Sequence, residues 1–374
     1  MLEMIFDPYS YPFWVLIIVI LVGVIAIISR PFSTYVKFVY PNAKFEAIGN
    51  PFVSEKSLSS LVESKHLSSF VESVNAVKDY DIQGDTVAAV QQSLDNAFLR
   101  TILMMRKDSA KKMDAFYQAY LQKSDGYLIK QALRQKIEGK QLDPSFTERA
   151  HDQHTKTLLH MIEEGDADQL PKLLESQGVD RSVVDTLSAN PIDFLVVDTA
   201  IDRHTLQRFS EVKLPYKCTQ ATKQFIAVTK DIQNIKHLLR AKQLEYPLET
   251  FDHLFLGDGQ EIASWKFSEL AEVDSVSQII ASLEGTSYYV PLKDAIEQYT
   301  QDESVQVFEQ ALDRRFLHLV RDISTQHYVT IGPTLRFLVS KEFEIKNLKI
   351  IAKGIAEQFS PSMITPLLVM EDPA

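Results

Sequence analysis

Three segments of this chain repeat one spacing of charged residues, and this repeat is the clearest candidate for chemistry in the sequence. Each has an acid, a lysine five residues later and a second base four residues after the lysine; the segments read DGYLIKQALRQK, DIQNIKHLLRAK and EIKNLKIIAKGI. In chain order these residues are Asp125, Lys130 and Arg134, then Asp231, Lys236 and Arg240, then Glu344, Lys349 and Lys353. On a helix the two bases of a segment share one face and can bind carboxylates there.

Two interpretations of these residues stay open from the sequence. In the structural one, each acid caps the start of a helix, and the bases pair with acids of neighbouring helices in the same chain. In the functional one, the six bases surround a central space and bind acidic groups of a partner or of this chain. The threefold recurrence indicates that the positions serve a shared architecture, and both interpretations are compatible with that.

A second candidate site is the histidine-rich segment HDQHTKTLLH. His151 and His154 are three residues apart and can share a helical face, whereas His160 falls on a different face. The zinc-protease spacing H-E-x-x-H is missing from the segment. The spacing therefore favours a solvated helix face over a metal site. This cluster is the only feature of the sequence that points toward an enzyme.

The single cysteine and the most turn-like stretch do not indicate a catalytic or cofactor site. Cys218 excludes a disulfide within the chain, fits a reducing compartment, and is expected to behave as a small hydrophobe. Gly257 and Gly259 lie in FDHLFLGDGQ, which lacks the preceding strand and the GxxxxGK[ST] pattern of a phosphate-binding loop, so it is interpreted as a turn between lobes. The sequence thus predicts no catalytic, cofactor-binding or metal-binding residues.

Composition favours helices and excludes nucleic acid as a partner. Only 12 of the 374 residues are glycine, and 50 acids against 39 bases give a net charge of −11. A nucleic-acid site would need a basic patch strong enough to overcome this charge, and the sequence has none. We therefore expect an all-α protein that binds other proteins or a membrane.

Residues 11–29, from Tyr11 to Ser29, form the one candidate for a membrane-spanning helix. Residues 13–28 carry no charge, and about 18 helical residues span about 27 Å, enough for a hydrocarbon core. The first ten residues have no lysine or arginine, which argues against a signal peptide. Bases follow the apolar run at Arg30, Lys37 and Lys44, so a single-pass helix with the bulk of the chain on the cytoplasmic face is predicted.

The repeat predicts three similar helical lobes. The lysines of the three segments lie 106 and 113 residues apart, which is the size of a small domain and far longer than a solenoid repeat. A proline follows each segment, at Pro144, Pro247 and Pro361, where it would stop a helix. The expected division is a tail and transmembrane helix at 1–30 and lobes at 31–145, 146–252 and 253–374.

Three longer segments contain the repeat: YLQKSDGYLIKQALRQK from Tyr120, VTKDIQNIKHLLRAK from Val228 and RFLVSKEFEIKNLKII from Arg336. They resemble the C subunits of archaeal-type ATP synthases, which are the counterparts of the d subunits of vacuolar ATPases. The resemblance runs from about Tyr40 to the C-terminus. It implies a funnel of three helical lobes that sits on the membrane rotor ring, receives the tip of the central axle and carries no catalytic residues. On this basis we expect a non-catalytic central-stalk subunit, without a cofactor, that couples the axle to the proteolipid ring of a proton- or sodium-translocating ATP synthase or ATPase.

The apolar helix distinguishes this chain from the family it resembles, whose members are usually soluble. If the chain turns with the ring, a helix in the outer lipid would meet the stationary ion-channel subunit, whereas a helix in the ring lumen would not. We therefore expect residues 11–29 to thread the ring near its axis. The alternative is a membrane-anchored helical adaptor protein without a rotary role.

Overall fold

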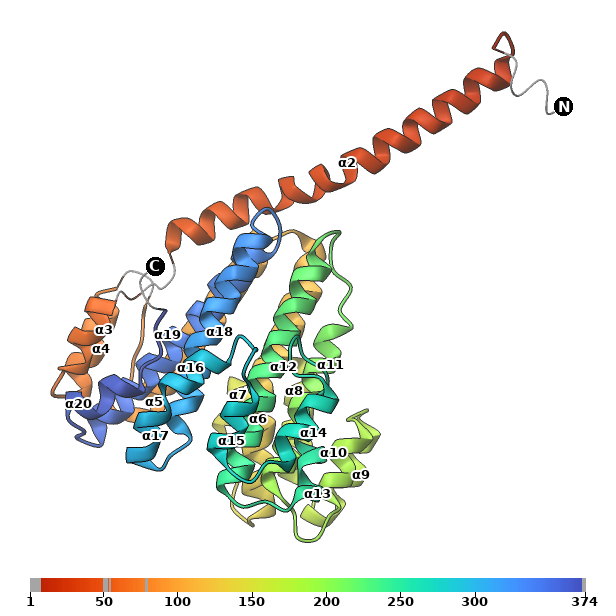
Figure 1. The fold of residues 1–374 in the computed structure, drawn as a ribbon. Helices are drawn as coiled ribbons and strands as arrows, with labels where there is room; N and C mark the ends of the chain where they lie inside the picture. The colour runs from red at the N-terminus through yellow and green to blue at the C-terminus, as the bar shows by residue number, and fades with distance from the viewer. Residues whose placement is uncertain (1–7, 50–52, 54, 78–79, 372–374) are drawn as a thin grey trace.

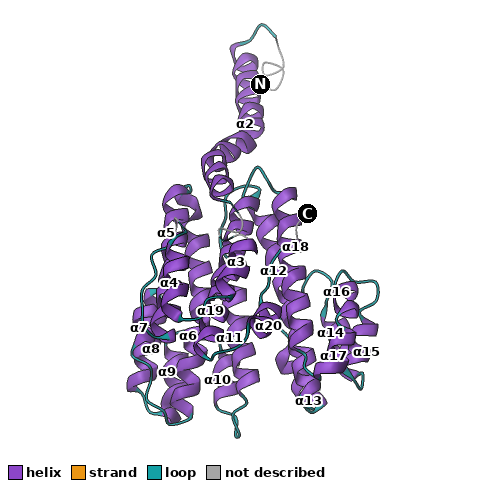
Figure 2. Cartoon of the chain, turned by 90° about the vertical axis from the view of Figure 1, so that its left-hand side faces the viewer, coloured by secondary structure: helices purple, strands orange, loops and turns teal. Residues whose placement is uncertain are grey.

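The computed structural model describes residues 8–49, 53, 55–77 and 80–371, and within these every regular element is a helix, which confirms the all-α class (Figures 1 and 2). The longer helices are α2 (Tyr11–Ile48), α5 (Val87–Asp108), α6 (Asp114–Ile137), α11 (Phe194–Ser210), α12 (Cys218–Gln243), α18 (Gln306–Gln326) and α19 (Gly332–Ala356). The shorter ones are α3 (Glu55–Val62), α4 (Leu67–Asn75), α7 (Ser145–Arg149), α8 (Gln153–Glu164), α9 (Leu170–Ser176), α10 (Arg181–Leu187), α13 (Leu248–Phe251), α14 (Ser264–Glu272), α15 (Val276–Ser282), α16 (Tyr289–Asp294), α17 (Ile296–Asp302) and α20 (Pro361–Ile364). Single 3-10 turns lie at Lys111–Met113, Ala167–Gln169, Asp252–Leu254 and Thr365–Leu367.

The three charged segments occupy the same position in three long helices, α6, α12 and α19, which we call the marker helices. In each, the acid lies twelve residues before the last helical residue: Asp125 before Ile137, Asp231 before Gln243 and Glu344 before Ala356. The expectation that these acids cap helix starts is therefore wrong, because all three lie near the middle of a helix. The helix already satisfies the backbone there, so each carboxylate can bind another element.

The marker helices also end in the same way. Each is followed by a residue in the left-handed conformation, with φ of 69°, 53° and 59° at Gly139, Glu245 and Gln358. The next N–H donates back to a carbonyl of the last turn, over 2.8 Å from Lys140 to Gln135, 3.0 Å from Tyr246 to Ala241 and 2.8 Å from Phe359 to Gly354. This is a Schellman cap. The helices therefore stop at these caps, before the prolines that the sequence suggested as terminators.

Each marker helix packs against a second long helix: α6 against α11, α12 against α18, and α19 against α5. The last pair joins the C-terminal part of the chain to its N-terminal part, and α3 and α4 pack on α19 as well. These pairs cross the expected lobe boundaries, since α6 and α11 belong to different lobes in that division. The boundaries 31–145, 146–252 and 253–374 stay a prediction.

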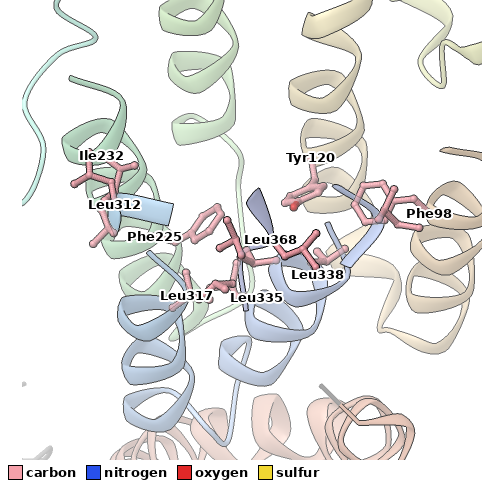
Figure 3. Packing of buried hydrophobic residues seen from close by; sticks show 14 of the residues in the cluster. Phe98, Tyr120, Phe225, Ile232, Leu312, Leu317, Leu335, Leu338 and Leu368 are labelled. Carbon is pink, nitrogen blue, oxygen red and sulfur yellow. The ribbon is translucent and has the colours of Figure 1, made fainter. Parts of the chain in front are cut away.

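A layer of aromatic side chains fills the space between the N-terminal halves of the marker helices. Ring centroids lie 5.5 Å apart for Phe116 and Phe209, and 6.3 Å apart for Phe209 and Phe225. Phe225 in turn lies 5.9 Å from Phe316. Figure 3 shows further members of this buried cluster around Phe225: Tyr120, Leu335, Leu338 and Leu368. Because each buried phenylalanine stabilises the fold by about 1.5–3 kcal/mol, this layer holds the three marker helices together.

The first half of α2 projects away from the body of the protein (Figure 1). Ser10 caps the helix by accepting a hydrogen bond from the Phe13 N–H. The apolar side chains that follow are exposed, with Ile18 at 57% and Ile27 at 74% of their accessible surface. Among the described residues, α2 is the one helix long and apolar enough to cross a membrane, by length and composition.

The second half of α2 lies across one end of the bundle (Figure 1), so the helix continues to Ile48 rather than ending at Ser29 as the sequence predicted. Its buried face consists of Thr34, Phe38, Pro41, Asn42 and Phe45, a helical spacing. This half of α2 also contacts three segments that connect long helices. Lys44 pairs with Asp108 at the end of α5, and Arg30 lies over the ring of Tyr216 between α11 and α12. Asn42 donates a hydrogen bond to the Tyr328 carbonyl between α18 and α19. The helix thus covers the end at which all three marker helices begin.

Candidate functional site

The C-terminal halves of the marker helices surround a cavity of about 820 Å³. Its lining on α6, α12 and α19 begins at Lys123, Thr229 and Glu342, beyond the aromatic layer. The charged lining consists of the bases Lys123, Lys130, Arg149, Arg240, Lys346, Lys349 and Lys353 and the acids Asp95, Asp125, Asp198, Asp202 and Glu342. Bases thus exceed acids by seven to five here, whereas acids exceed bases by 50 to 39 in the whole chain. The cavity is a basic region of an acidic protein.

The three marker lysines make equivalent ion pairs with the helices that pack on their own helix. Lys130 Nζ lies 2.6 Å from Asp202 Oδ1 on α11, and Lys236 Nζ lies 2.5 Å from Asp313 Oδ1 on α18. Lys349 pairs with Asp95 on α5. The same position of the repeat therefore joins each marker helix to its packing partner. This is the pairing that the structural interpretation of the sequence expected.

The second bases extend two of these pairs into ladders. Arg134 Nη2 lies 3.2 Å from Asp198 Oδ2, and Arg240 donates to both oxygens of Glu309 over 2.5 and 2.6 Å. In both cases the acid lies four residues before the first acid of the ladder, as two antiparallel helices require. The third ladder has one rung, because the residue four before Asp95 is Gln91. No residue that the structure describes forms an ion pair with Lys353.

The ion pair between Lys236 and Asp313 in the α12–α18 ladder is buried, and this burial sets the free energy that its loss would cost. Lys236 is only 5% exposed, and Lys346 Nζ lies 2.8 Å from the other oxygen of Asp313. Burial by itself raises the pKa of Asp313, but the two lysine ammonium groups outweigh it and lower that pKa below its ordinary value. The carboxylate is therefore charged at neutral pH. Removing one partner of such a buried pair costs about 3–5 kcal/mol, because the other charge is left without compensation.

The marker acids fasten loops to the marker helices, and Asp231 shows this most completely. Its Oδ2 accepts hydrogen bonds from the N–H groups of Gln260 and Glu261 over 2.9 and 2.8 Å and from the Tyr288 hydroxyl over 3.0 Å. Its Oδ1 accepts from the Ile262 N–H over 2.9 Å. The glycine-rich stretch that was interpreted as a turn is therefore the loop that wraps this carboxylate.

Asp125 and Glu344 do the same for other segments. Asp125 accepts hydrogen bonds from the N–H groups of His151 and Asp152 over 2.8 and 2.9 Å, which fixes the start of α8. Glu344 accepts from the Val53 N–H over 3.2 Å and from the Tyr80 hydroxyl. The third acid thus binds segments from the opposite end of the chain, in keeping with the packing of α19 on α5.

Comparison with known proteins identifies the family to which this arrangement belongs. The family model described as ATP synthase (C/AC39) subunit matches residues 41–367, which is most of the chain. The chain belongs to this family. It is therefore a non-catalytic, accessory subunit of a rotary ATP synthase or ATPase complex rather than an enzyme in its own right.

Several archaeal relatives, each named as the C subunit of an A-type ATP synthase, match over nearly the full length. The chain is 29% identical to the one from Methanobrevibacter smithii, with 94% of each chain covered. It is 26% identical to the one from Methanothermobacter thermautotrophicus, covering 93% of this chain and 92% of the relative. It is 27% identical to the one from Methanocaldococcus jannaschii, covering 92% and 90%. The family match contains the cavity and all nine marker residues, whereas the exposed apolar part of α2 precedes it.

Two asparagines bind the backbone of other segments, although they were not predicted to do so from the sequence. Asn234 donates to the Gly257 carbonyl over 3.1 Å and accepts from the Leu256 N–H over 2.9 Å. Asn347 makes the same two bonds to the backbone of Val369, at 2.7 and 3.0 Å. Both lie three residues after the marker acid, in DIQN and EIKN, so the alignment of the segments contained the signal. The first copy has Leu128 at this position.

The histidine cluster is dispersed in the structure. His151 Nδ1 lies 2.6 Å from Asp125 Oδ1, while His160 is exposed beside Glu163 and Glu164. Within the described ranges, no three histidine, cysteine or acidic residues are arranged to hold a metal ion. Cys218 is fully buried, and burial raises the pKa of its thiol to about 12, so its behaviour as a small hydrophobe is confirmed.

Proposed function

We propose that this protein is the central-stalk subunit of the rotor, which couples the central axle to the membrane proteolipid ring. The observation that carries the proposal is the basic cavity at the centre of the three marker helices, within a fold whose family consists of rotary ATPase subunits. A cavity of about 820 Å³ is large enough to take the end of a helical segment of another protein. The excess of bases in the lining favours a segment that carries acids.

The arrangement of α2 supports an orientation of the protein in the complex. The apolar half of α2 leaves from the end where the marker helices begin, and the cavity lies beyond the aromatic layer toward their other end. If α2 enters the membrane, the covered end faces the ring and the cavity faces the soluble motor. The bases Arg30, Lys37 and Lys44 after the apolar run favour an orientation with the bulk of the chain on the cytoplasmic face and the apolar half of α2 as a single membrane pass.

The repeated geometry supports three similar lobes around the cavity, arranged as a funnel. The register of the marker acids, the helix caps and the lysine pairs recur in α6, α12 and α19. Torque passes through such a body only if the helices do not slide past one another. The ion-pair ladders between helices and the aromatic layer supply that stiffness.

We also propose that the apolar part of α2 occupies the lumen of the ring. A helix beside a rotating ring would meet the stationary ion-channel subunit in each revolution, whereas a helix on the axis turns freely. Residues 13–28 have no polar face, which suits a lumen filled with lipid or apolar side chains. Because the helix continues without interruption onto the body, the lumen segment would be joined directly to the funnel.

A photo-crosslinking experiment in the native complex tests this placement. A photoreactive residue at Ile18, which is 57% exposed, should react with the inner helices of the proteolipids. The same group at Val290 on α16, which is 61% exposed, is the matched control and should give no proteolipid crosslink. Crosslinks from Ile18 only to stator subunits or to outer ring helices would instead indicate a membrane-anchored adaptor beside the motor.

A further inference from the structure

The three ladders differ in charge although their helices repeat. The α6–α11 ladder pairs two bases, Lys130 and Arg134, with two acids. At the α12–α18 ladder, Lys346 joins the two marker bases, so three bases face two acids. At the α5–α19 ladder the bases Lys349 and Arg149 share the single acid Asp95, and Lys353 lines the same cavity without an ion pair among the described residues. The excess of bases over acids is therefore none at the α6–α11 ladder, one at the α12–α18 ladder and two at the α5–α19 ladder.

The charge difference has an identifiable origin in the sequence. The other two ladders have an acid four residues before the first one, Asp198 before Asp202 and Glu309 before Asp313. On α5 this position is Gln91, a side chain of similar size without a charge. Gln91 and Lys353 both line the central cavity. One glutamine in place of an acid thus leaves Lys353 without the acidic partner that the second base of each other ladder has.

We propose that the α5–α19 side of the cavity, around Lys353, is the docking site for an acidic side chain at the tip of the central axle. Lys353 lies three residues before the end of α19 and is exposed, so an entering segment can reach it from the end of the bundle opposite to the one that α2 covers. Lys349 and Arg149 next to it strengthen the attraction for a carboxylate. The inference rests on the proposed function, because it names the contact by which the axle is held.

The asymmetry also gives the contact a mechanical role. A cup with three identical walls would accept an axle in three equivalent rotational positions. The unequal charge of the three walls makes one position more favourable than the other two, because an acid on the axle finds the largest excess of bases at the α5–α19 side. The α5–α19 side therefore fixes the rotational register between axle and funnel. A torque-transmitting joint needs such a register, since slippage would uncouple the two parts.

Two substitutions test this charge from opposite sides. Lys353→Gln removes the base, and Gln91→Glu supplies the carboxylate that completes the third ladder and neutralises Lys353 within the chain. Lys172→Gln, on the outer surface of α9, makes the same charge change far from the cavity and is the matched control. Each full-length variant is purified in detergent, its melting temperature is recorded, and its affinity for the purified axle subunits of the same complex is measured at low and high salt.

We expect Lys353→Gln and Gln91→Glu each to weaken axle binding about tenfold at low salt, with a shallower salt dependence and unchanged melting temperatures. Lys172→Gln should bind like the unsubstituted chain. If both cavity variants bind the axle as tightly as the unsubstituted chain does, the docking site is refuted while the proposed function stands. If the unsubstituted chain does not bind the axle at all, the proposed function fails first.

A further measurement distinguishes an acidic protein segment from a small anion. Inorganic phosphate is titrated into the full chain and into Lys353→Gln at constant ionic strength. We expect no phosphate binding that depends on Lys353, because a flexible base in a wide cavity holds an anion firmly only when a larger interface positions that anion. Phosphate binding that is lost in Lys353→Gln and does not compete with the axle would assign the site to a free anion and overturn the proposal.

Discussion

The substitution Asp231→Asn tests whether the marker acids hold the loops on the marker helices. The carboxylate accepts four hydrogen bonds, three at Oδ2 and one, from the Ile262 N–H, at Oδ1. Asparagine offers a single acceptor oxygen. If that oxygen takes the place of Oδ2, the amide nitrogen faces the Ile262 N–H, so two donors meet and a buried N–H loses its partner.

The cost follows from these contacts. Leaving one buried N–H unsatisfied costs about 1–3 kcal/mol. The three remaining hydrogen bonds lose the negative charge that makes them about twice as strong, which adds about 1–2 kcal/mol. The expected loss is therefore about 2–5 kcal/mol. For a chain of this size that corresponds to a melting temperature lower by about 3–6 °C.

The assay is thermal unfolding of the full-length chain in detergent. Asp322→Asn on α18 removes an exposed carboxylate and is the control, expected to change stability by less than about 0.5 kcal/mol. Asp125→Asn and Glu344→Gln should lower the melting temperature as well, since both acids bind backbone N–H groups of other segments. A melting temperature of Asp231→Asn equal to that of Asp322→Asn would refute this account of the marker acids.

Three further predictions concern residues near the marker helices. Gly259→Ala should destabilise the chain by several kcal/mol in chemical denaturation, because its Cβ would lie 1.8 Å from the Asp231 carboxylate; an unchanged midpoint would show that the loop can shift. Burial lowers the pKa of His237 in the folded chain to about 4. In the unfolded chain this histidine has its ordinary pKa of about 6.5, so between these two pH values the unfolded chain binds a proton that the folded chain does not. Stability should fall by up to about 3 kcal/mol between these pH values, and less steeply in His237→Gln; equal slopes would contradict this. Cys218 should resist maleimide until the chain unfolds, and rapid labelling of the folded protein would contradict its burial.

The repeat and the all-α class were readable from the sequence because both are local properties. Helical periodicity, scarce glycine and the spacing of acid, lysine and second base depend on neighbouring residues. The equivalent register of Asp125, Asp231 and Glu344 followed from aligning the segments, although the alignment misplaced these acids at helix starts. A capping role is the usual one for an aspartate before a helical pattern, and only the fold reveals that α6, α12 and α19 begin more than ten residues earlier.

The partners of the marker residues could not be predicted, because they are distant in the sequence. Lys349 pairs with Asp95 across 254 residues, and Glu344 binds the Val53 N–H across 291. The end of α2 was missed for a related reason. Hydropathy falls after Ser29, but the helix continues because Phe38 and Phe45 are buried against the body. Tertiary packing decided these features, and no local pattern contains it.

An electron cryo-microscopy map of the complete complex from native membranes tests the central claim most directly. The account predicts this chain between axle and ring, with an axle segment inside the cavity beside Lys353 and the apolar half of α2 within the ring lumen. An empty cavity in a chain bound to the stator at the edge of the ring would contradict it.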